Sequence, residues 1–382
     1  MRFSGDLVLR DVESKKRLVG VLERSLSVEE IRRARADSHA KRKPRPCGLT
    51  IHTSTGCSYG CLYCYIYDMG FSRTPRPYPL TGLQLAYALV VNESFVMGPH
   101  GTLLAFGSVT EPFMDVAKRR TMEYLRVTNS LLGNPQQISV KGVLDSSEVE
   151  EFVECTKGRI DVLISVTTLD KARVLEPGAP SPHARIDFGA ELARAGISVA
   201  LFVRPILPGV TDSEFAKILG EAERRGIRRV VLGTLRVTET ILKRLTASKA
   251  VDVDALRSRV PESPRSPRHQ VPLRASDLKK KLETEARELG FKVYPAACSS
   301  SIDAHSLYCR LCWMGPCGVE SGRVDVDDDG VRDAGEVLGA RVETSISENL
   351  VEVACRGSRR ACYRLKLYLE TIAKIRARVK MV

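Results

Sequence analysis

Three cysteines, Cys57, Cys61 and Cys64, stand close together in the segment CSYGCLYC. In a chain without a secretion signal, clustered thiols bind metal more often than they form disulfides. Three thiolates on one short loop suit an iron–sulfur cluster, because such clusters prefer cysteine ligands. A cubane held by three cysteines keeps one iron open for a small molecule, as catalytic metal sites do. A zinc ion that takes a fourth, distant ligand is the alternative.

The chain around this motif alternates between short β-rich runs and longer helical stretches, which is the pattern of parallel βα units. We count six units, with strands expected at residues 49–53, 102–106, 137–140, 161–166, 198–203 and 229–232. Helices are expected between them, for example at 81–91, 116–131, 187–195 and 213–225. Such a series fits either an incomplete barrel or a doubly wound sheet. In both folds the functional residues lie at the carboxyl ends of the strands.

Composition divides the rest of the chain into further regions. Residues 1–46 end in a basic, proline-broken stretch and are expected to form an exposed extension. The six units occupy 47–245, and a proline-rich linker with a helix is expected at 246–290. A small Cys-rich C-terminal domain is expected at 291–382, and a basic helix from about Ser358 to Lys380 would close the chain.

The overall composition excludes some classes of protein. With 43% hydrophobic and 27% charged residues among 382, the chain is an ordinary globular one and not a disordered one. It has no apolar run long enough for a membrane span and no N-terminal signal core, so a cytoplasmic location without membrane contact is expected. The net charge of +13 favours a polyanionic partner. Only four Asn and four Gln occur, a depletion typical of proteins that work hot.

The cysteine motif, with the aromatic Tyr63 before its last cysteine, resembles the radical SAM superfamily. This resemblance implies an α/β fold, a partial (β/α)6 barrel. It also implies a [4Fe-4S] cluster on the three cysteines, whose open iron chelates the amino and carboxylate groups of S-adenosylmethionine (SAM). Electron transfer from a donor such as ferredoxin or flavodoxin would cleave SAM to methionine and a 5′-deoxyadenosyl radical, which abstracts hydrogen from a substrate.

Over about residues 47–240 the chain resembles the spore photoproduct lyase-like group of that superfamily. The matching stretches are TGCSYGCLYCY, FGSVTEP, ISVKG, ISVTTLD with LEPGAPSP, and VRPILPGVTD. The resemblance places cofactor contacts at Tyr63, Gly107, Ser108, Glu111, Lys141 and Ser165. Of these, the second, third and fourth correspond to contacts with the SAM amino group, and the last two to contacts with its carboxylate and ribose region. Arg204 is a further candidate for contact with cofactor or substrate. Ordinary strand-end polarity is the alternative for each.

The sequence departs from photoproduct lyases just after the second strand. Those enzymes return a hydrogen atom from a cysteine at this place, where this chain has Val109 and Thr110. We therefore do not expect strict photoproduct lyase activity. A different substrate, or another hydrogen donor such as a tyrosine, would be needed.

A second group of thiols lies near the C-terminus, and we predict that it binds either a second iron–sulfur cluster or structural zinc. Its members are Cys298, Cys309, Cys312 and Cys317, with His305 as a possible substitute ligand. Disulfides or unconnected core thiols are the alternative. Cys355 and Cys362 are interpreted as a disulfide, extra ligands or core, and Cys47 and Cys155 as core. Residues 325–336 (DVDDDGVRDAGE) match the EF-hand calcium pattern, but their flanks favour an acidic hairpin tip.

These observations predict a radical SAM enzyme that acts on a base or sugar of RNA or DNA. Four aromatic residues near the cysteine motif could stack on bases: Tyr59, Tyr65, Tyr67 and Phe71. Modification of a peptide or protein is the first alternative. The second is a non-catalytic iron–sulfur or zinc protein that binds nucleic acid.

Overall fold

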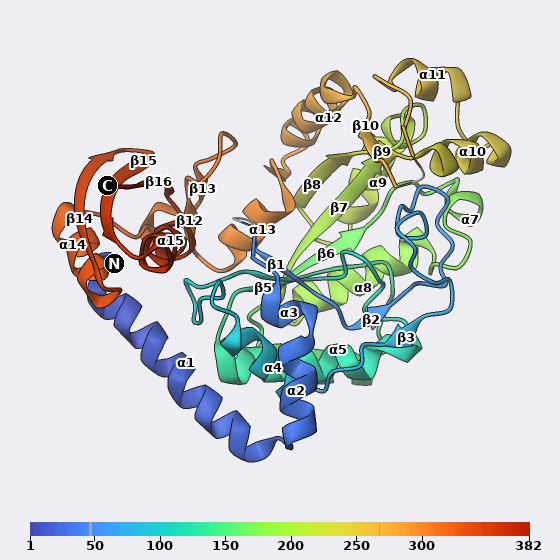
Figure 1. Cartoon of the computed structure of the whole chain (residues 1–382). Coiled ribbons are helices and arrows are strands. Elements are labelled where there is room, and N and C mark those ends of the chain that lie inside the picture. The colour runs from blue at the N-terminus through green and yellow to red at the C-terminus, as the bar shows by residue number, and fades with distance from the viewer. Residues whose placement is uncertain (46–47, 267) are drawn as a thin grey trace.

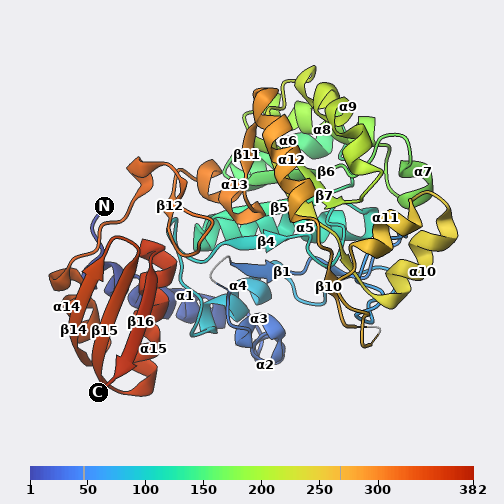
Figure 2. The ribbon, with the colours of Figure 1, turned by 90° about the horizontal axis from the view of Figure 1, so that it is seen from above.

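A computed structural model describes residues 1–45, 48–266 and 268–382 and divides into a large and a small lobe (Figures 1 and 2). Cys47, interpreted above as core, lies outside the described residues. Within them, no helix combines the length and the apolar character that crossing a bilayer demands.

The large lobe is built on a sheet of seven parallel strands. Their order is β1 (Leu49–Ile51), β4 (Leu104–Phe106), β5 (Gln136–Val140), β6 (Asp161–Ser165), β7 (Ser198–Ile206), β8 (Arg229–Thr234) and β11 (Lys292–Tyr294). The first six strands are those expected from the sequence. Because the strands follow one another in chain order, without the reversal of a doubly wound sheet, the fold is a partial barrel.

Five helices follow the strands and cover the outer face of the sheet (Figure 1). They are α4 (Gly82–Val91), α5 (Asp115–Val127), α6 (Ser146–Thr156), α8 (Pro182–Arg194) and α9 (Thr211–Glu223). Side-chain caps fix several of their starts, since Thr81 and Asp145 each form a capping box and Ser181 accepts a hydrogen bond from Ala184 N.

Strand alternation separates the outer core from the barrel interior. On β6, Val162 and Ile164 belong to the main apolar core shared with the outer helices, whereas Leu163 belongs to a separate interior cluster with Ala200 and Val231. Successive side chains on a strand point to opposite faces, so every second residue faces the interior. The same alternation determines which residues at the strand ends face the cavity.

The segment expected to be a linker is folded onto the barrel. Residues 246–290 contain α11 (Val253–Ser258), α12 (Ser276–Glu288) and β10 (Val271–Pro272), which pairs with β9 (Arg236–Val237). Strand β11 follows residue 290, yet it pairs with β8 and completes the central sheet. The sheet therefore extends beyond the boundary expected at residue 245, because a parallel neighbour satisfies the open edge of β8.

Helix α13 (Ala297–Ala304) follows β11 and packs on the sheet. Nε2 of Gln137 donates to Ala297 O at 2.7 Å, and the Ser300 hydroxyl donates to the carboxylate of Asp161 at 3.0 Å. Both contacts are with the inner face of the strands, so α13 fills the amino-terminal end of the barrel interior.

The small lobe is a three-stranded sheet of β14 (Ala340–Ser347), β15 (Leu350–Gly357) and β16 (Arg376–Met381) with α14 (Asp328–Val337) and α15 (Arg359–Tyr368). The N-terminal helix α1 (Gly5–Ser25) lies against α14 (Figure 1). Phe3 and Val8 are buried in this lobe's core, and Phe3 N donates to Asp325 O at 2.8 Å. The start of the chain is thus part of the fold, and the expectation of an exposed extension was wrong for residues 1–45. Phe3 and Val8 pack into the small lobe, whereas Leu22, Leu26 and Ala34 pack into the core of the large lobe.

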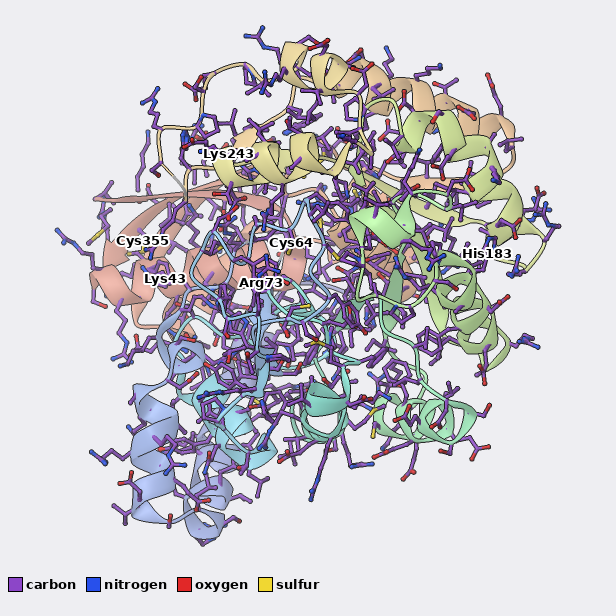
Figure 3. The ribbon with its side chains drawn as sticks, turned by 90° about the vertical axis from the view of Figure 1, so that its right-hand side faces the viewer. Lys43, Cys64, Arg73, His183, Lys243 and Cys355 are labelled. Atoms are coloured by element: carbon purple, nitrogen blue, oxygen red, sulfur yellow. A yellow bond between two sulfur atoms is a disulfide. The ribbon has the colours of Figure 1, made fainter. Side chains whose placement is uncertain are left out.

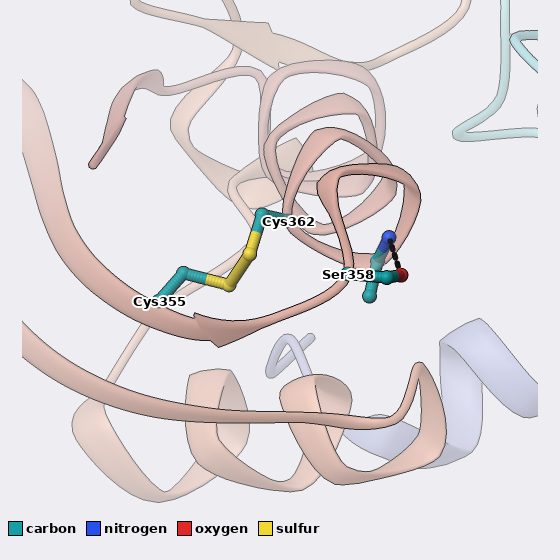
Figure 4. Close-up of a disulfide and its surroundings, with 4 residues drawn as sticks. Cys355, Ser358 and Cys362 are labelled. Atoms are coloured by element: carbon teal, nitrogen blue, oxygen red, sulfur yellow. Dashed lines mark hydrogen bonds between the residues drawn. A yellow bond between two sulfur atoms is a disulfide. The ribbon is translucent and has the colours of Figure 1, made fainter. Parts of the chain in front are cut away.

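Two local expectations for this lobe were also wrong. The basic helix expected to reach Lys380 ends at Ala373, after which Lys374 has a left-handed φ of 48° and β16 pairs with β15. The acidic segment is no hairpin tip, because Asp327 caps the start of α14 by accepting from Gly330 N. Cys355 and Cys362 form a disulfide between β15 and α15 (Figure 4).

Candidate functional site

A cavity of about 360 Å³ opens at the carboxyl ends of the barrel strands. It is lined by Cys57, Cys61 and Cys64 together with every residue for which a cofactor contact was expected. Those residues are Tyr63, Gly107, Ser108, Glu111, Lys141, Ser165 and Arg204. The fold therefore gathers residues from five separate segments at one place.

Strand alternation explains why these side chains meet. Lys141 follows the end of β5 on the same face as Ser139, and both line the cavity. Ser165 ends β6 on the face of Leu163, and Arg204 lies on β7 on the face of Phe202. Because side chains two positions apart share a face, the polar strand ends converge above the interior cluster.

Tyr67 fastens the cysteine loop. Its hydroxyl donates to Cys57 O at 2.9 Å and accepts from Gly60 N at 3.1 Å. The guanidinium of Arg73 lies 4.7 Å from the centre of its ring and that of Arg244 5.8 Å, distances typical of cation–π contacts. Figure 3 shows Arg73 and Cys64 in the same part of the molecule.

Arg244 fastens the other end of the loop. Its Nη2 donates to Cys64 O at 2.8 Å and lies 3.4 Å from the carboxylate of Asp68. Tyr67 and Arg244 together satisfy carbonyl groups at both outer cysteines. The loop thus holds its shape through contacts that leave the three thiols facing the cavity.

The thiols fit a cluster better than a single ion. No three His, Cys, Asp or Glu side chains in the described ranges are arranged to hold one metal ion, the three cysteines included. A single zinc requires its sulfurs about 2.3 Å from one point, whereas in a cubane each cysteine bonds a different iron. Burial raises the pKa of Cys57 to about 11, so a cationic cluster would be needed to hold these thiolates charged.

Glu111 is a buried carboxylate at the cavity wall. It accepts hydrogen bonds from Lys141 N at 2.7 Å and Phe113 N at 3.2 Å. Burial raises its pKa, and these backbone donors oppose the rise. Gly107 beside it has φ +87°, and an added Cβ would lie 2.2 Å from Ser139 O, so this position accepts glycine alone.

Two further buried residues, Glu176 and Arg185, lie behind the cavity wall in contact with Tyr63 and Ser165, and the sequence analysis missed them. Glu176, in the segment after β6, pairs with Nη1 of Arg185 at 2.6 Å and lies 3.9 Å from Nζ of Lys141. Burial would raise the pKa of Glu176, but the charges of Lys141 and Arg185 outweigh it and hold this pKa below its usual value. Glu176 lies in the stretch LEPGAPSP, but no hydrophobic periodicity in a sequence indicates that a residue forms a buried ion pair.

The four aromatic residues that were expected to stack on bases do not all lie at the cavity. Tyr59 and Tyr65 line the cavity, and the hydroxyl of Tyr65 donates to Ser108 O at 2.8 Å. The hydroxyl of Tyr67 is hydrogen-bonded to the backbone of the cysteine loop, and Phe71 packs against the small apolar cluster around Cys57. At the position of the lyase cysteine, Thr110 lines the cavity and donates to Gly56 O at 2.8 Å.

Two cysteines of the second group lie opposite each other. Cys309 and Cys317 face each other in the hairpin of β12 (Tyr308–Cys309) and β13 (Cys317–Gly318). Burial, with Cys309 and Cys312 nearby, raises the pKa of Cys317 to about 11. Cys298 lies on α13, and His305 contacts the backbone of Gln136. A second metal centre stays a prediction.

The sequence profile of the Radical SAM superfamily matches residues 51–222. An uncharacterized protein of Mycobacterium tuberculosis, Rv2578c, is 25% identical over 204 residues, which cover 49% of this chain and 58% of that protein. The uncharacterized protein ORF301 of Acidianus two-tailed virus is 23% identical over 175 residues, 42% of this chain and 56% of its own. The chain thus spans less than two thirds of each relative.

Solved structures of spore photoproduct lyase share the fold. A variant with bound AdoMet and dinucleoside spore photoproduct superimposes with a TM-score of 0.56 at 16% identity, covering 70% of this chain and 84% of that one. A second variant gives 0.54 at 17% identity, covering 66% and 78%. At such identities the likeness concerns the arrangement of the elements.

Proposed function

We propose that this chain, which belongs to the radical SAM superfamily through residues 51–222, is an enzyme. In this enzyme Cys57, Cys61 and Cys64 hold a [4Fe-4S] cluster. The observation that carries the proposal is the single cavity that the three thiols share with Lys141 and Glu111. The family implies both the cluster and SAM. When bound and reduced, the cluster supplies the electron that cleaves SAM into methionine and a 5′-deoxyadenosyl radical.

The chain's own residues would bind and orient SAM. Lys141 is a cation at a strand end, suited to the carboxylate of an amino acid. Glu111 presents a carboxylate fixed by two backbone donors, suited to an ammonium group. Gly107 and Ser108 let the backbone approach closely, and Ser165 offers a hydroxyl. Leu163 and Phe202 below them keep the floor apolar and exclude water.

The substrate that we favour is a base or sugar of RNA or DNA. Net charge +13 and two arginines at the cavity support a polyanion, and Tyr59 and Tyr65 offer rings for stacking. A tyrosine at the cavity could act as hydrogen donor in place of the absent cysteine. A peptide substrate is the alternative, and an external donor such as ferredoxin or flavodoxin is the proposed source of electrons.

The test is anaerobic. The protein is reconstituted with iron and sulfide, reduced and given SAM, and 5′-deoxyadenosine is quantified with and without bulk RNA or DNA. The triple variant Cys57→Ala, Cys61→Ala, Cys64→Ala should form none. Cys155→Ala, which changes a buried cysteine on α6 outside the cavity, is the matched control and should behave as wild type.

Stimulation of deoxyadenosine formation by one nucleic acid would identify the substrate class. Stimulation by peptides alone would favour the alternative. A protein with a full cluster that forms no deoxyadenosine under any of these conditions would leave a non-catalytic binding protein as the better description.

A further inference from the structure

Two arginines at the cavity have no acidic partner. Among the described residues, neither Arg204 nor Arg236 forms an ion pair or a side-chain hydrogen bond, whereas Arg244 at the cysteine loop pairs with Asp68. Both side chains line the cavity, and both residues are exposed. Unpaired guanidinium groups beside a cavity are suited to an anionic ligand, because the planar fork matches carboxylate and phosphate oxygens.

The position of Arg204 is built by its neighbours. It lies where the pairing of β7 with β8 shifts register between Val203 and Ile206, and such irregularities re-aim side chains. Its stem crosses Gly233 of β8, where an added Cβ would lie 2.6 Å from Cδ and 2.8 Å from Cγ of the arginine. Its guanidinium carbon is 5.9 Å from the centre of the Phe202 ring. A missing side chain at 233 thus makes room for this arginine.

Arg236 is held on the adjoining segment. It belongs to β9 (Arg236–Val237), which pairs with β10 (Val271–Pro272). Arg204 on β7 and Arg236 on β9 therefore reach the same cavity from two different strands.

The charge balance of the cavity favours a ligand with more negative charge than an amino acid carries. Besides the three cysteines, which are assigned to the cluster, its lining holds three cationic side chains, those of Lys141, Arg204 and Arg236, and one carboxylate, that of Glu111. Glu111 and Lys141 suffice for the two charged ends of an amino acid. The arginine pair remains for a second anion.

We propose that Arg204 and Arg236 form a clamp for a phosphodiester group of a single-stranded nucleic acid, next to the nucleotide that enters the cavity. This inference rests on the proposed function for the identity of the cavity, and it adds the group by which the substrate is held. Gly233 is the positioning residue of the clamp, since it seats the stem of Arg204.

The test measures binding of a fluorescein-labelled 12-nucleotide single strand, as RNA and as DNA, to the reconstituted, unreduced enzyme by fluorescence anisotropy. Arg204→Ala and Arg236→Ala should each weaken binding about tenfold, as expected for one lost charged hydrogen-bond pair. The double variant should lower the slope of log affinity against log salt by about 0.7, the value for one phosphate on a single strand. Arg119→Ala, an exposed arginine on α5, is the matched control and should change neither quantity.

Gly233→Ala tests the clamp without changing any charge. It should weaken oligonucleotide binding because Arg204 must move, and it should have no further effect in the Arg204→Ala background. If the loss persists in that background, the substitution damages the strand itself and the positioning role of Gly233 is refuted. Circular dichroism on each variant monitors the fold.

Other outcomes would overturn the clamp. SAM affinity is measured on the same variants, and a loss of SAM binding as large as the loss of oligonucleotide binding would assign the arginines to the cofactor. Binding of a glutamate-rich peptide in place of either oligonucleotide, lost in Arg204→Ala, would assign them to a carboxylate. A wild type that cleaves SAM but binds no oligonucleotide refutes the clamp and the nucleic-acid substrate, and leaves the proposed SAM-cleaving activity standing. A wild type that binds the oligonucleotide but does not cleave SAM would retain the clamp and refute the catalytic proposal.

Discussion

The phenol of Tyr63 donates a hydrogen bond to the carboxylate of Glu176, which lies 113 positions further along the chain. The same carboxylate pairs with Arg185, and both of these side chains are almost completely buried. Since Tyr63 stands between two of the cavity cysteines, the contact joins the cysteine loop to the segment after β6. The loop's position thus depends on a buried ion pair.

Glu176→Gln should destabilise the protein strongly. Removing one charge leaves Arg185 buried without its partner, which typically costs about 3–5 kcal/mol of unfolding free energy. Urea denaturation of the cluster-free protein measures the loss. Glu352→Gln, which breaks an exposed pair with Arg378, is the control and should cost no more than about 1 kcal/mol. Equal effects of the two substitutions would contradict a structural role for Glu176.

Asp161 should give the fold a defined pH dependence. Burial raises its pKa to about 6, whereas in the unfolded chain an aspartate titrates near ~3.9. Between these values the folded state binds more protons at Asp161, so the contribution of Asp161 to stability is greatest below about pH 4 and falls as the pH rises to about 6. The difference in unfolding free energy between wild type and Asp161→Asn should fall by about 3 kcal/mol over this window. A pH-independent difference would show that Asp161 is not perturbed.

The disulfide between Cys355 and Cys362 should stabilise the small lobe. It closes a loop with a sequence separation of 7, and chain entropy for a loop of that size amounts to about 2–3 kcal/mol. The variant Cys355→Ser, Cys362→Ser should therefore unfold at lower urea, and wild type with reductant should approach it. If reductant shifts the urea midpoint of the double variant as much as that of wild type, the effect comes from other thiols. SAM binding in the large lobe should stay unchanged.

Lys141→Gln should weaken SAM binding if the lysine holds the carboxylate. A charged hydrogen bond contributes about 1.5–3 kcal/mol, which corresponds to a loss of about 10- to 100-fold. Equilibrium dialysis measures it, with Lys217→Gln on the outside of α9 as control. Methylthioadenosine lacks the amino-acid part of SAM, so the variant should bind it as wild type does. Equal losses for both ligands would mean that Lys141 only supports the fold.

The order of the main elements followed from the sequence because strand and helix patterns are local. Each of the first six barrel strands is read from a run of β-branched and apolar residues, and period-two alternation places Lys141 and Ser165 on the interior face. The spacing of Cys57, Cys61 and Cys64 within one loop is also a local property. Metal-ligand chemistry constrains such spacing directly, so the motif predicts a cluster site without knowledge of the fold.

Contacts between distant segments were decided by the tertiary structure alone. Phe3 joins the core of the C-terminal lobe, β11 closes the sheet from beyond residue 290, and the partner of Tyr63 is Glu176. Each contact depends on which surface remains uncovered after the local elements have formed. Gly233 is a further example. From the sequence, a glycine within a strand only weakens that strand, whereas the structure shows that its missing side chain leaves room for the stem of Arg204. Local periodicity carries no information about such complementary surfaces, because burial selects among them only when the whole chain packs.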